Sequence, residues 1–300
     1  MAASRRRLWL SGFALATAAL FVAAAAWRAS RTTATLGTPA GPAQDEGRAP
    51  LARPEASRTL NTCPICGRRS VFRQFRIPTV LKEKEICGSC GAFARHRLLY
   101  LFLQERTDLF TKAYRVIEFS PTAGLAKALR AKPNLRYVTS EYGPGADLDQ
   151  DLTNLKLPDG SFDVAICFHV LEHIPDDRKA MRELYRILEP GGWAVVQVPL
   201  RSQPDTLEDP AFDTPRERLE HYRQEDHVRY YGAEDFADRL TQAGFQVQVV
   251  QIEEFARSLG AEKVREYALR LDQKIYLLRK REARARPGKR AKGPTPLPSR

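Results

Sequence analysis

The sequence predicts an α/β fold in which a doubly wound sheet follows a small module built around four cysteines. Three observations lead to this prediction. Strand-like and helix-like segments alternate from Tyr114 onward, the segment Phe162–Phe168 is almost continuously apolar, and two Cys-x-x-Cys pairs precede both. Strands separated by helices of about 10–15 residues indicate βαβ units. A continuous apolar run is typical of a parallel strand covered on both faces.

Length and composition support a well-buried core. The chain has 300 residues, of which 43% are hydrophobic and 28% charged, and these values exclude a wholly disordered, collagen-like or polytopic membrane protein. We expect the following order of elements: strands at 115–119, 137–141, 162–168, 193–198, 246–252 and 274–278, with helices at 123–131, 176–188 and 232–243. The second of these helices is predicted to stop at Glu189-Pro190-Gly191-Gly192. In such sheets ligands bind at the carboxyl ends of the strands.

The two ends of the chain carry its positive charge. The formal net charge is +12, to which residues 1–31 contribute +5 and residues 279–300 contribute +8, so that residues 32–278 carry −1. The middle of the chain therefore has no basic surplus of the kind that nucleic-acid binding uses. The basic tail at 281–300 is either a solvated end or a segment attracted to anionic lipid or RNA.

An uncharged run of 20 residues, 8–27, follows three arginines near the amino terminus. Its length suits a membrane span, and Ala24-Ala25-Ala26 would also serve as a cleavage site. We interpret residues 1–31 as a membrane anchor, with a cleaved signal peptide or a start site assigned too early as alternatives. Residues 32–59 contain four prolines and three glycines but no aromatic, valine or isoleucine residue, which predicts a flexible linker.

The four cysteines have the spacing of a metal site. Cys63 and Cys66 form one pair, Cys87 and Cys90 form the other, 20 residues separate the pairs, and a glycine follows each. Four thiolates at this spacing suit a tetrahedral zinc ion, and segment 71–77 alternates like a strand. We predict a structural zinc ribbon, with two disulfides or a rubredoxin-like iron site as alternatives. The fifth cysteine, Cys167, is predicted to be a small buried hydrophobic residue.

A basic cluster, Arg95-His96-Arg97, follows the ribbon and leads into a predicted buried helix at 98–103. Two interpretations stay open: the cluster holds an anionic group of a substrate, or it pairs with neighbours at a domain seam. We expect the ribbon and its bridging helix to occupy 60–112 and the sheet domain to occupy 113–280.

The later motifs resemble those of class I S-adenosylmethionine-dependent methyltransferases of the type 11-like kind. The resemblance is carried by the run from Leu157 to His169-Val-Leu-Glu-His-Ile-Pro-Asp-Asp177 and its continuation through Gly192. Asp226-His-Val-Arg-Tyr-Tyr-Gly232 is similar to the distal part of a bacterial subgroup that carries an amino-terminal zinc ribbon followed by Arg-His-Arg. The resemblance covers about residues 60–280. It implies a Rossmann-like sheet, S-adenosylmethionine as cofactor, and methyl transfer.

The resemblance also implies roles for residues at the strand ends. Glu118 begins the cofactor loop, Glu141 accepts the two ribose hydroxyls, Asp151 takes the adenine amino group, and Phe168 with His169 forms the wall beside the methionine part. The full set of cofactor-binding residues that the resemblance implies is Glu118, Phe119, Ser120, Gly124, Glu141, Tyr142, Asp151, Leu152, Phe168 and His169.

The cofactor loop departs from the wider family's pattern of an acid followed by three alternating glycines. Here it is Glu118-Phe-Ser-Pro-Thr-Ala-Gly124, with Ser120 and Thr122 in place of the first two glycines. Glycine lets backbone approach a ligand closely, so we expect a loop of different shape. Loss of cofactor binding is the alternative.

Residues His169 to His173 also fit the H-x-x-E-H signature of a zinc peptidase. That chemistry needs both histidines on one helical face, whereas His169 directly leaves a strand and Pro175 follows closely, so we do not expect such a helix. The candidate general bases for methyl transfer are His169, His173 and His227. The last of these lies in the 200–231 insertion, which is predicted to form a lid over the substrate.

The predicted methyl acceptor is a small molecule or a glycan precursor. The alternatives are an RNA methyltransferase that uses the ribbon and the basic tail, and a catalytically inactive binding module. By the positive-inside rule, the three arginines before the apolar run weakly favour a cytoplasmic amino terminus and an exported domain. S-adenosylmethionine is made in the cytoplasm, and thiolates stay reduced there. We therefore predict that residues 60–300 face the cytoplasm, associated with the inner membrane through residues 8–27 and the basic tail.

Overall fold

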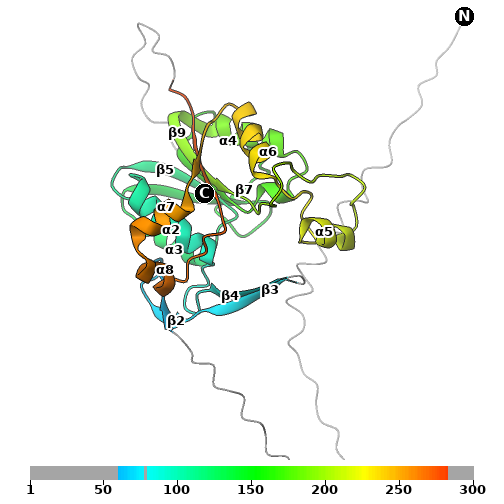
Figure 1. The fold of residues 1–300 in the computed structure, drawn as a ribbon. Coiled ribbons are helices and arrows are strands. Elements are labelled where there is room, and N and C mark those ends of the chain that lie inside the picture. Colours follow the sequence, from blue (N-terminus) through cyan, green and yellow to red (C-terminus); the bar gives the residue numbers. More distant parts are fainter. Residues whose placement is uncertain (1–59, 78–79, 283–300) are drawn as a thin grey trace, which may run out of the picture. The chain divides into compact units, whose positions relative to one another are not determined.

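The computed structural model describes residues 60–77 and 80–282 (Figure 1). The predicted anchor or signal segment at 1–31, the linker at 32–59 and nearly all of the basic tail lie outside these ranges. Within them, no helix is both long enough and apolar enough to cross a membrane.

The main sheet has seven strands in the order β10-β11-β9-β8-β5-β6-β7. Strands β5 to β9 run parallel to their neighbours, whereas β11 is antiparallel to both β9 and β10. The strand order reverses direction at β5, which confirms the doubly wound sheet. The strands are β5 (Tyr114–Phe119), β6 (Leu135–Glu141), β7 (Leu148–Asp149), β8 (Phe162–Phe168), β9 (Leu188–Gln197), β10 (Gln246–Val250) and β11 (Ile275–Arg279).

Helices cover both faces of this sheet, with α4 and α6 on one side and α2, α3 and α7 on the other (Figure 1). Successive side chains of β8 are buried on opposite faces of the sheet. Val164 and Ile166 pack with α2 and α7, whereas Ala165 and Cys167 pack with α4 and α6. Cys167 is fully buried, as predicted. The helices are α2 (Ala94–Arg106), α3 (Ala123–Arg130), α4 (Asp177–Ile187), α5 (Pro215–Tyr222), α6 (Ala233–Gln242), α7 (Ile252–Leu259) and α8 (Ala261–Glu266).

The strand after α4 begins earlier than predicted. The helix does stop at Ile187, but β9 already starts at Leu188 rather than at Trp193, and its pairing with β8 shifts register across the Pro-Gly-Gly segment. Backbone bonds between this segment and Lys280 hold it against the sheet. A Cβ on Gly192 would lie 2.8 Å from the Glu189 carbonyl oxygen and 2.9 Å from that of Asp163, so only glycine fits there.

Two other boundaries were predicted wrongly. The strand expected at 71–77 breaks at Phe72, whose side chain is buried, into β2 (Arg69–Val71) and β3 (Arg73–Ile77), which pair with β1 (Leu60–Thr62) and β4 (Val80–Ile86) respectively. The strand expected at 246–252 ends at Val250 because the chain turns into α7.

Candidate functional site at the carboxyl edge of the sheet

The four cysteines of the ribbon converge on one point. Their sulfur atoms all lie within 4.8 Å of one another, with 3.8 Å between Cys63 and Cys90 and 4.0 Å between Cys66 and Cys87. A tetrahedral zinc ion with bonds of about 2.3 Å would hold sulfurs about 3.8 Å apart, and a disulfide would need about 2.05 Å. Gly67 and Gly91, directly after the pairs, adopt φ of 69° and 75°. The donor set therefore fits a structural zinc ion, and it fits a four-thiolate iron site equally.

Arg97 ties the ribbon to the rest of the protein. Its fully buried guanidinium donates five hydrogen bonds to backbone carbonyls and lies over the Phe72 ring. The acceptors belong to Lys84, Glu85, Ala92, Tyr267 and Ala268. Burial lowers the pKa of Arg97, and the nearby thiols of the ribbon oppose that shift. Of the two interpretations of the basic cluster, Arg97 therefore fits the domain seam.

The ribbon packs against the start of the cofactor loop helix, α3. A Cβ on Gly124 would lie 2.7 Å from the carbonyl oxygen of Cys90, so a glycine is needed here for contact with the ribbon. His96, buried on α2, lies 3.3 Å through Nδ1 from the hydroxyl of Thr122 in the same loop. The glycine that the sequence analysis assigned to cofactor binding thus also has a packing role.

The predicted cofactor residues come together at the carboxyl edge of the sheet. Strands β5, β6 and β8 are adjacent, and Phe119 pairs with Ser140 and Cys167, so Ser120, Glu141 and Phe168 are level, with His169 one residue further. Ser120 adopts φ of 52°, a conformation that glycine takes more easily, and its amide donates to the Ser140 carbonyl at 2.9 Å. Ser120 therefore holds a left-handed conformation that a glycine would adopt without strain.

Glu118 and Glu141 have opposite environments. Glu118 is buried and accepts a hydrogen bond from the hydroxyl of Tyr137. Burial raises its pKa to about 7, although the Tyr137 hydrogen bond opposes the shift. Glu141 is exposed, and its carboxylate has no hydrogen bond or ion pair to any other residue in the described ranges. A free carboxylate at this strand end has the chemistry that a ribose diol needs.

The remaining predicted residues differ in exposure. Tyr142 is 82% exposed, Asp151 is exposed while Leu152 beside it is buried, and Phe168 is buried at the end of β8. Asp151 uses Oδ1 for the amide and hydroxyl of Thr153, which leaves Oδ2 available. The donor and acceptor groups present therefore fit an adenosine-bearing cofactor.

The three candidate bases form a single cluster with a fourth residue, Glu172. Nδ1 of His169 lies 3.2 Å from Oε1 of Glu172, and ligand atoms of Glu172, His173 and His227 lie within 4.8 Å of one another. The short helix η1 (Leu171–His173) is a single 3-10 turn, and His169 precedes it with φ of 57°. As expected, no long helix presents both histidines of the H-x-x-E-H sequence.

The cluster holds its histidines in different protonation environments. Burial lowers the pKa of both His169 and His227. Burial would also lower the pKa of His173, but its contact with Asp226 and the charge of Glu172 outweigh it and raise the pKa. His221, by contrast, stacks on Phe212 at 3.7 Å and lies outside the cluster.

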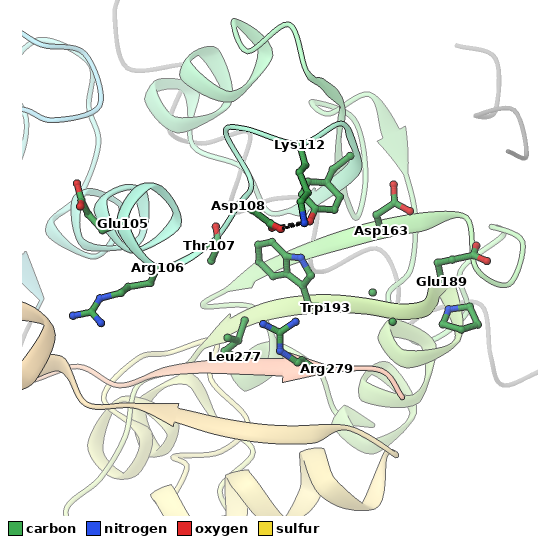
Figure 2. A pocket seen from close by; sticks show the side chains of 14 residues that line it. Glu105, Arg106, Thr107, Asp108, Lys112, Asp163, Glu189, Trp193, Leu277 and Arg279 are labelled. Carbon is green, nitrogen blue, oxygen red and sulfur yellow. Dashed lines mark hydrogen bonds and ion pairs between the residues drawn. The ribbon is translucent and has the colours of Figure 1, made fainter. Parts of the chain in front are cut away.

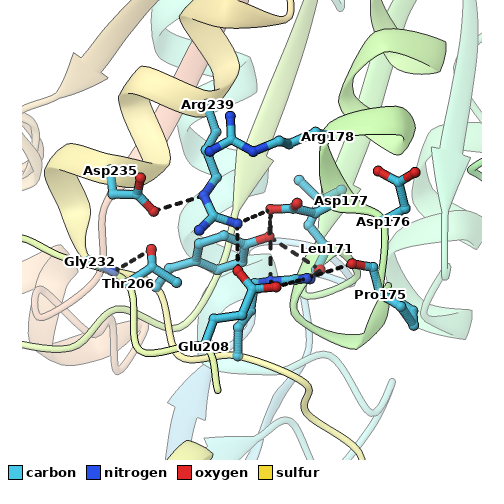
Figure 3. Close-up of polar contacts among 12 residues, drawn as sticks. Leu171, Pro175, Asp176, Asp177, Arg178, Thr206, Glu208, Gly232, Asp235 and Arg239 are labelled. Carbon is cyan, nitrogen blue, oxygen red and sulfur yellow. Dashed lines mark hydrogen bonds and ion pairs between the residues drawn. The ribbon is translucent and has the colours of Figure 1, made fainter. Parts of the chain in front are cut away.

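A buried ionic network fastens the 200–231 insertion to the start of α4. Asp177 Oδ2 and Glu208 Oε2 each accept from Arg239 Nη1 at 2.9 Å, and Arg239 also pairs with Asp235 (Figure 3). Arg229, 1% exposed, donates to Glu208 and to the carbonyls of Leu171, Ile174 and Pro175. The segment that carries His227 is therefore fixed to η1, and whether other parts of the insertion act as a lid stays a prediction.

A cavity of about 810 Å³ lies at the opposite, amino edge of the sheet (Figure 2). Several of its polar groups already have partners: Asp163 accepts from the amide and guanidinium of Arg115, and Lys112 pairs with Asp108 at 2.8 Å. Its volume alone is no argument for a binding site, because the predicted ligand residues lie at the other edge.

Sequence reasoning missed three residues that shape the site: Glu172, Asp226 and Arg229. Each was visible within a quoted motif, but none was assigned a role. The available signal was the combination of H-x-x-E-H with a later histidine in Asp226-His227, because a Glu and two His residues are common metal or proton-transfer groups.

Known proteins are similar to this chain in sequence or in structure. A family model described as a methyltransferase domain matches residues 91–250. A protein of Mycolicibacterium smegmatis, named probable S-adenosylmethionine-dependent methyltransferase, is 35% identical over 37% of this chain and 39% of its own. A ubiquinone biosynthesis O-methyltransferase of Albidiferax ferrireducens is 34% identical over 29% of this chain and 28% of its own.

The chain thus spans well under half the length of these two relatives. Among solved structures, the YcgJ protein of Bacillus subtilis aligns with 63% of this chain and 100% of its own, at 19% identity and a TM-score of 0.42. The methyltransferase-domain model, however, covers more than half of the chain. The chain therefore belongs to the class I S-adenosylmethionine-dependent methyltransferases.

Proposed function

We propose that this protein transfers a methyl group from S-adenosylmethionine to an oxygen of a small-molecule or glycan-type acceptor. The observation that carries the proposal is the position of the free Glu141 carboxylate on the same sheet edge as the cluster of His169, Glu172, His173 and His227. One end of the edge offers groups that suit a nucleoside, and the other offers groups that suit an acceptor hydroxyl.

S-adenosylmethionine, when bound, supplies a methyl group on a positively charged sulfur. The chain's own residues would hold its ribose at Glu141, its adenine near Asp151 and Leu152, and its methionine part near Phe168. Methyltransferases of this kind act mainly by placing the acceptor within attack distance. His169 follows the end of β8 at this edge, and burial lowers its pKa. As a candidate base it would pass the proton of the acceptor on to solvent.

The charge distribution favours a small-molecule or glycan acceptor over RNA. Residues 32–278 carry a net charge of only −1, and a phosphate backbone would be met by basic residues. An RNA methyltransferase or an inactive binding module would each give a different experimental result.

The test combines binding and product detection with the full-length chain. Calorimetric titration with S-adenosylmethionine is expected to show one binding event. The wild-type strain is expected to contain methylated metabolites, each one methylene unit heavier than its precursor, that a deletion strain lacks. Absence of cofactor binding would indicate the inactive module. RNA affinity that falls steeply with added salt, together with methylated RNA, would indicate the RNA enzyme.

We propose a cytoplasmic location for residues 60–300 because the cofactor is made there and the ribbon thiols need a reducing compartment. A reporter pair fused after Arg300 tests this proposal. Fluorescent GFP with inactive alkaline phosphatase is expected, and the reverse pattern would place the domain outside the cytoplasm.

A further inference from the structure

Glu172, His173 and His227 form a second group of potential metal ligands, separate from the cysteines. One donor atom from each lies within 4.8 Å of the other two, and the three side chains come from η1 and from the insertion more than 50 residues later. Glu172 and His227 are 1% and 4% exposed. A chance meeting of surface side chains does not produce this arrangement.

The buried carboxylate of Glu172 lacks the partners that a buried charge needs. Neither of its oxygens accepts a hydrogen bond within the described residues, and only Oε1 has an ion-pair contact, with His169 at 3.2 Å. Nε2 of His169 is also buried without a hydrogen bond in the described part of the chain. A buried carboxylate whose oxygens accept no hydrogen bond is costly unless a cation satisfies it more fully than this one contact does.

Both histidines of the group have Nδ1 next to an oxygen atom, as is common for metal-binding histidines. Nδ1 of His227 lies 3.1 Å from the carbonyl oxygen of Tyr222, and Nδ1 of His173 lies 3.2 Å from Oδ2 of Asp226. Metal-binding histidines commonly donate their second ring nitrogen to a carbonyl or carboxylate in this way, which fixes the tautomer. Nε2 of each ring, which has no hydrogen bond to the described residues, is then left as the donor atom for an ion.

The scaffold around the group is rigid. The amide of Val228 donates to the carbonyl of Glu172 at 2.9 Å, so the residue after His227 is bonded to the backbone of another donor. Arg229 and the network in Figure 3 hold the same two segments together. Donor atoms in a tetrahedral site with bonds of about 2.1 Å lie about 3.4 Å apart, a spacing that small side-chain rotations would reach.

We propose that Glu172, His173 and His227 bind a divalent transition-metal ion, of the zinc, cobalt or manganese class, that holds the oxygen of the methyl acceptor. Two imidazoles and one carboxylate suit such ions and leave coordination positions open. The group lies just beyond the carboxyl end of β8, beside His169. The part of the inference that concerns the acceptor rests on the proposed methyl transfer.

The charge balance of the transfer then follows. The acceptor hydroxyl, held by the ion, loses its proton to solvent, and its oxygen forms the new bond to the methyl carbon. The carbon–sulfur bond breaks and its electron pair stays on sulfur, which becomes neutral. A bound ion lowers the pKa of an oxygen ligand, so a hydroxyl too weakly acidic to react alone becomes a competent nucleophile.

The test is metal binding by the full-length chain, measured without any methyl acceptor. With zinc already in the ribbon, titration with Co²⁺ is expected to show one further equivalent whose absorption lacks the thiolate charge-transfer band of a cysteine site. Glu172→Gln and His227→Gln are each expected to abolish this equivalent. Asp226→Asn is expected to weaken it by about 10- to 100-fold, as for other partners of ligating histidines.

His221→Gln is the matched control, since His221 lies in the same insertion but outside the group. It is expected to bind the second equivalent as the wild type does. Circular dichroism and S-adenosylmethionine titration of every variant separate loss of the ion from loss of the fold.

A wild-type chain that binds metal only at the cysteines would overturn the inference and would leave the group as a metal-free proton relay. So would a second equivalent that survives both Glu172→Gln and His227→Gln. If the second equivalent binds but S-adenosylmethionine does not, the proposed methyl transfer fails while the metal site stands. If methyl transfer continues unchanged after selective removal of the second equivalent, the role of the ion toward the acceptor fails alone.

Discussion

The two edges of the seven-stranded sheet differ in how their polar groups are satisfied. At the amino edge, Asp163 and Asp108 are paired with Arg115, Lys112 and Tyr114 around a sizeable cavity. At the carboxyl edge, Glu172, His169, Ser140 and Gln197 each keep at least one buried polar atom without a hydrogen bond in the described residues. Unsatisfied buried groups are costly, so they indicate where a ligand completes the structure better than cavity volume does.

The ribbon contacts residues at the carboxyl edge of the sheet. It contacts the cofactor loop through Cys90 and Gly124, and His96 next to it contacts Thr122. Arg95, whose buried Nε has no hydrogen bond in the described part, is close enough to Glu172 to be influenced by its charge. A change in the ribbon is therefore expected to reach the site, whereas a change at the amino edge is not.

The largest expected effect is loss of the ribbon metal. Cys63→Ser removes one of four thiolates, and structural zinc in zinc-finger peptides is worth about 10–16 kcal/mol of apparent binding energy at neutral pH. We expect the purified chain to lose its single ribbon zinc and its unfolding free energy to fall by several kcal/mol, because Cys63 and Phe72 belong to the same core as α2.

Metal analysis and thermal unfolding measure this effect, and Cys167→Ala is the control. Cys167 is buried in β8 away from the ribbon, so its variant should lose some stability but keep its zinc. A wild-type chain with two disulfides and no metal would contradict the prediction, and iron in place of zinc would identify the rubredoxin-like alternative.

The second effect concerns the pH dependence of stability at Glu118. Its folded pKa of about 7 exceeds its ordinary value, so the folded state binds more protons than the unfolded state between about pH 4.5 and 7. Stability contributed by the protonated group is therefore lost as pH rises through this window. A shift of this size corresponds to on the order of 3 kcal/mol.

Glu118→Gln is expected to remove that slope. The unfolding free energy of the variant minus that of the wild type should increase from pH 4.5 to pH 8, whatever its value at pH 4.5. Denaturant titrations of both proteins across this range measure the increase. Equal slopes for the two proteins would mean that Glu118 is ionised without penalty in the folded state.

The third effect is on cofactor affinity. Glu141→Ala removes the free carboxylate at the end of β6, and we expect S-adenosylmethionine binding to weaken by about 1.5–3 kcal/mol, the range for a hydrogen bond to a charged group. Glu189→Ala is the matched control, because Glu189 lies at the amino edge and pairs with Arg115 at 3.4 Å. Calorimetric titration that shows equal affinity for both variants would place the ribose elsewhere.

The sequence predicted the elements that have a clear pattern of their own and missed those that depend on contacts with distant residues. The apolar strand β8 and the α4 helix have strong periodic patterns of their own, and both were predicted within one residue of their bounds. Strand β7 and helices α5 and α8 were missed because they are short and lack a comparable pattern. Helix α7 buries Ile252, Phe255 and Ala256 on one face, but it was missed because its first residue was assigned to the preceding strand. The early start of β9 depends on backbone bonds to Lys280, which no local pattern reveals.

The candidate site shows the same limit. Spacing alone identified the four cysteines, because both members of each pair are near in sequence. The roles of Glu172 and Arg229 depend on contacts across more than 50 residues, and those contacts exist only once the insertion is folded against η1. The left-handed conformation of Ser120 is another feature that the sequence did not reveal, and the expected difference in loop shape from the wider family stays a prediction.

The smallest expected effect belongs to the amino edge and tests the comparison directly. Lys112 lines the cavity of Figure 2 and pairs with Asp108 four residues before it, with the Lys112 side chain 69% exposed and that of Asp108 39% exposed. Exposed pairs at this spacing contribute about 0.3–0.5 kcal/mol, so Lys112→Ala should change unfolding free energy by no more than that and should leave S-adenosylmethionine affinity unchanged. Denaturant titration and calorimetry measure the two quantities. A marked loss of cofactor affinity in this variant would mean that the amino-edge cavity, with its paired charges, is the binding site, because Lys112 lies at that edge.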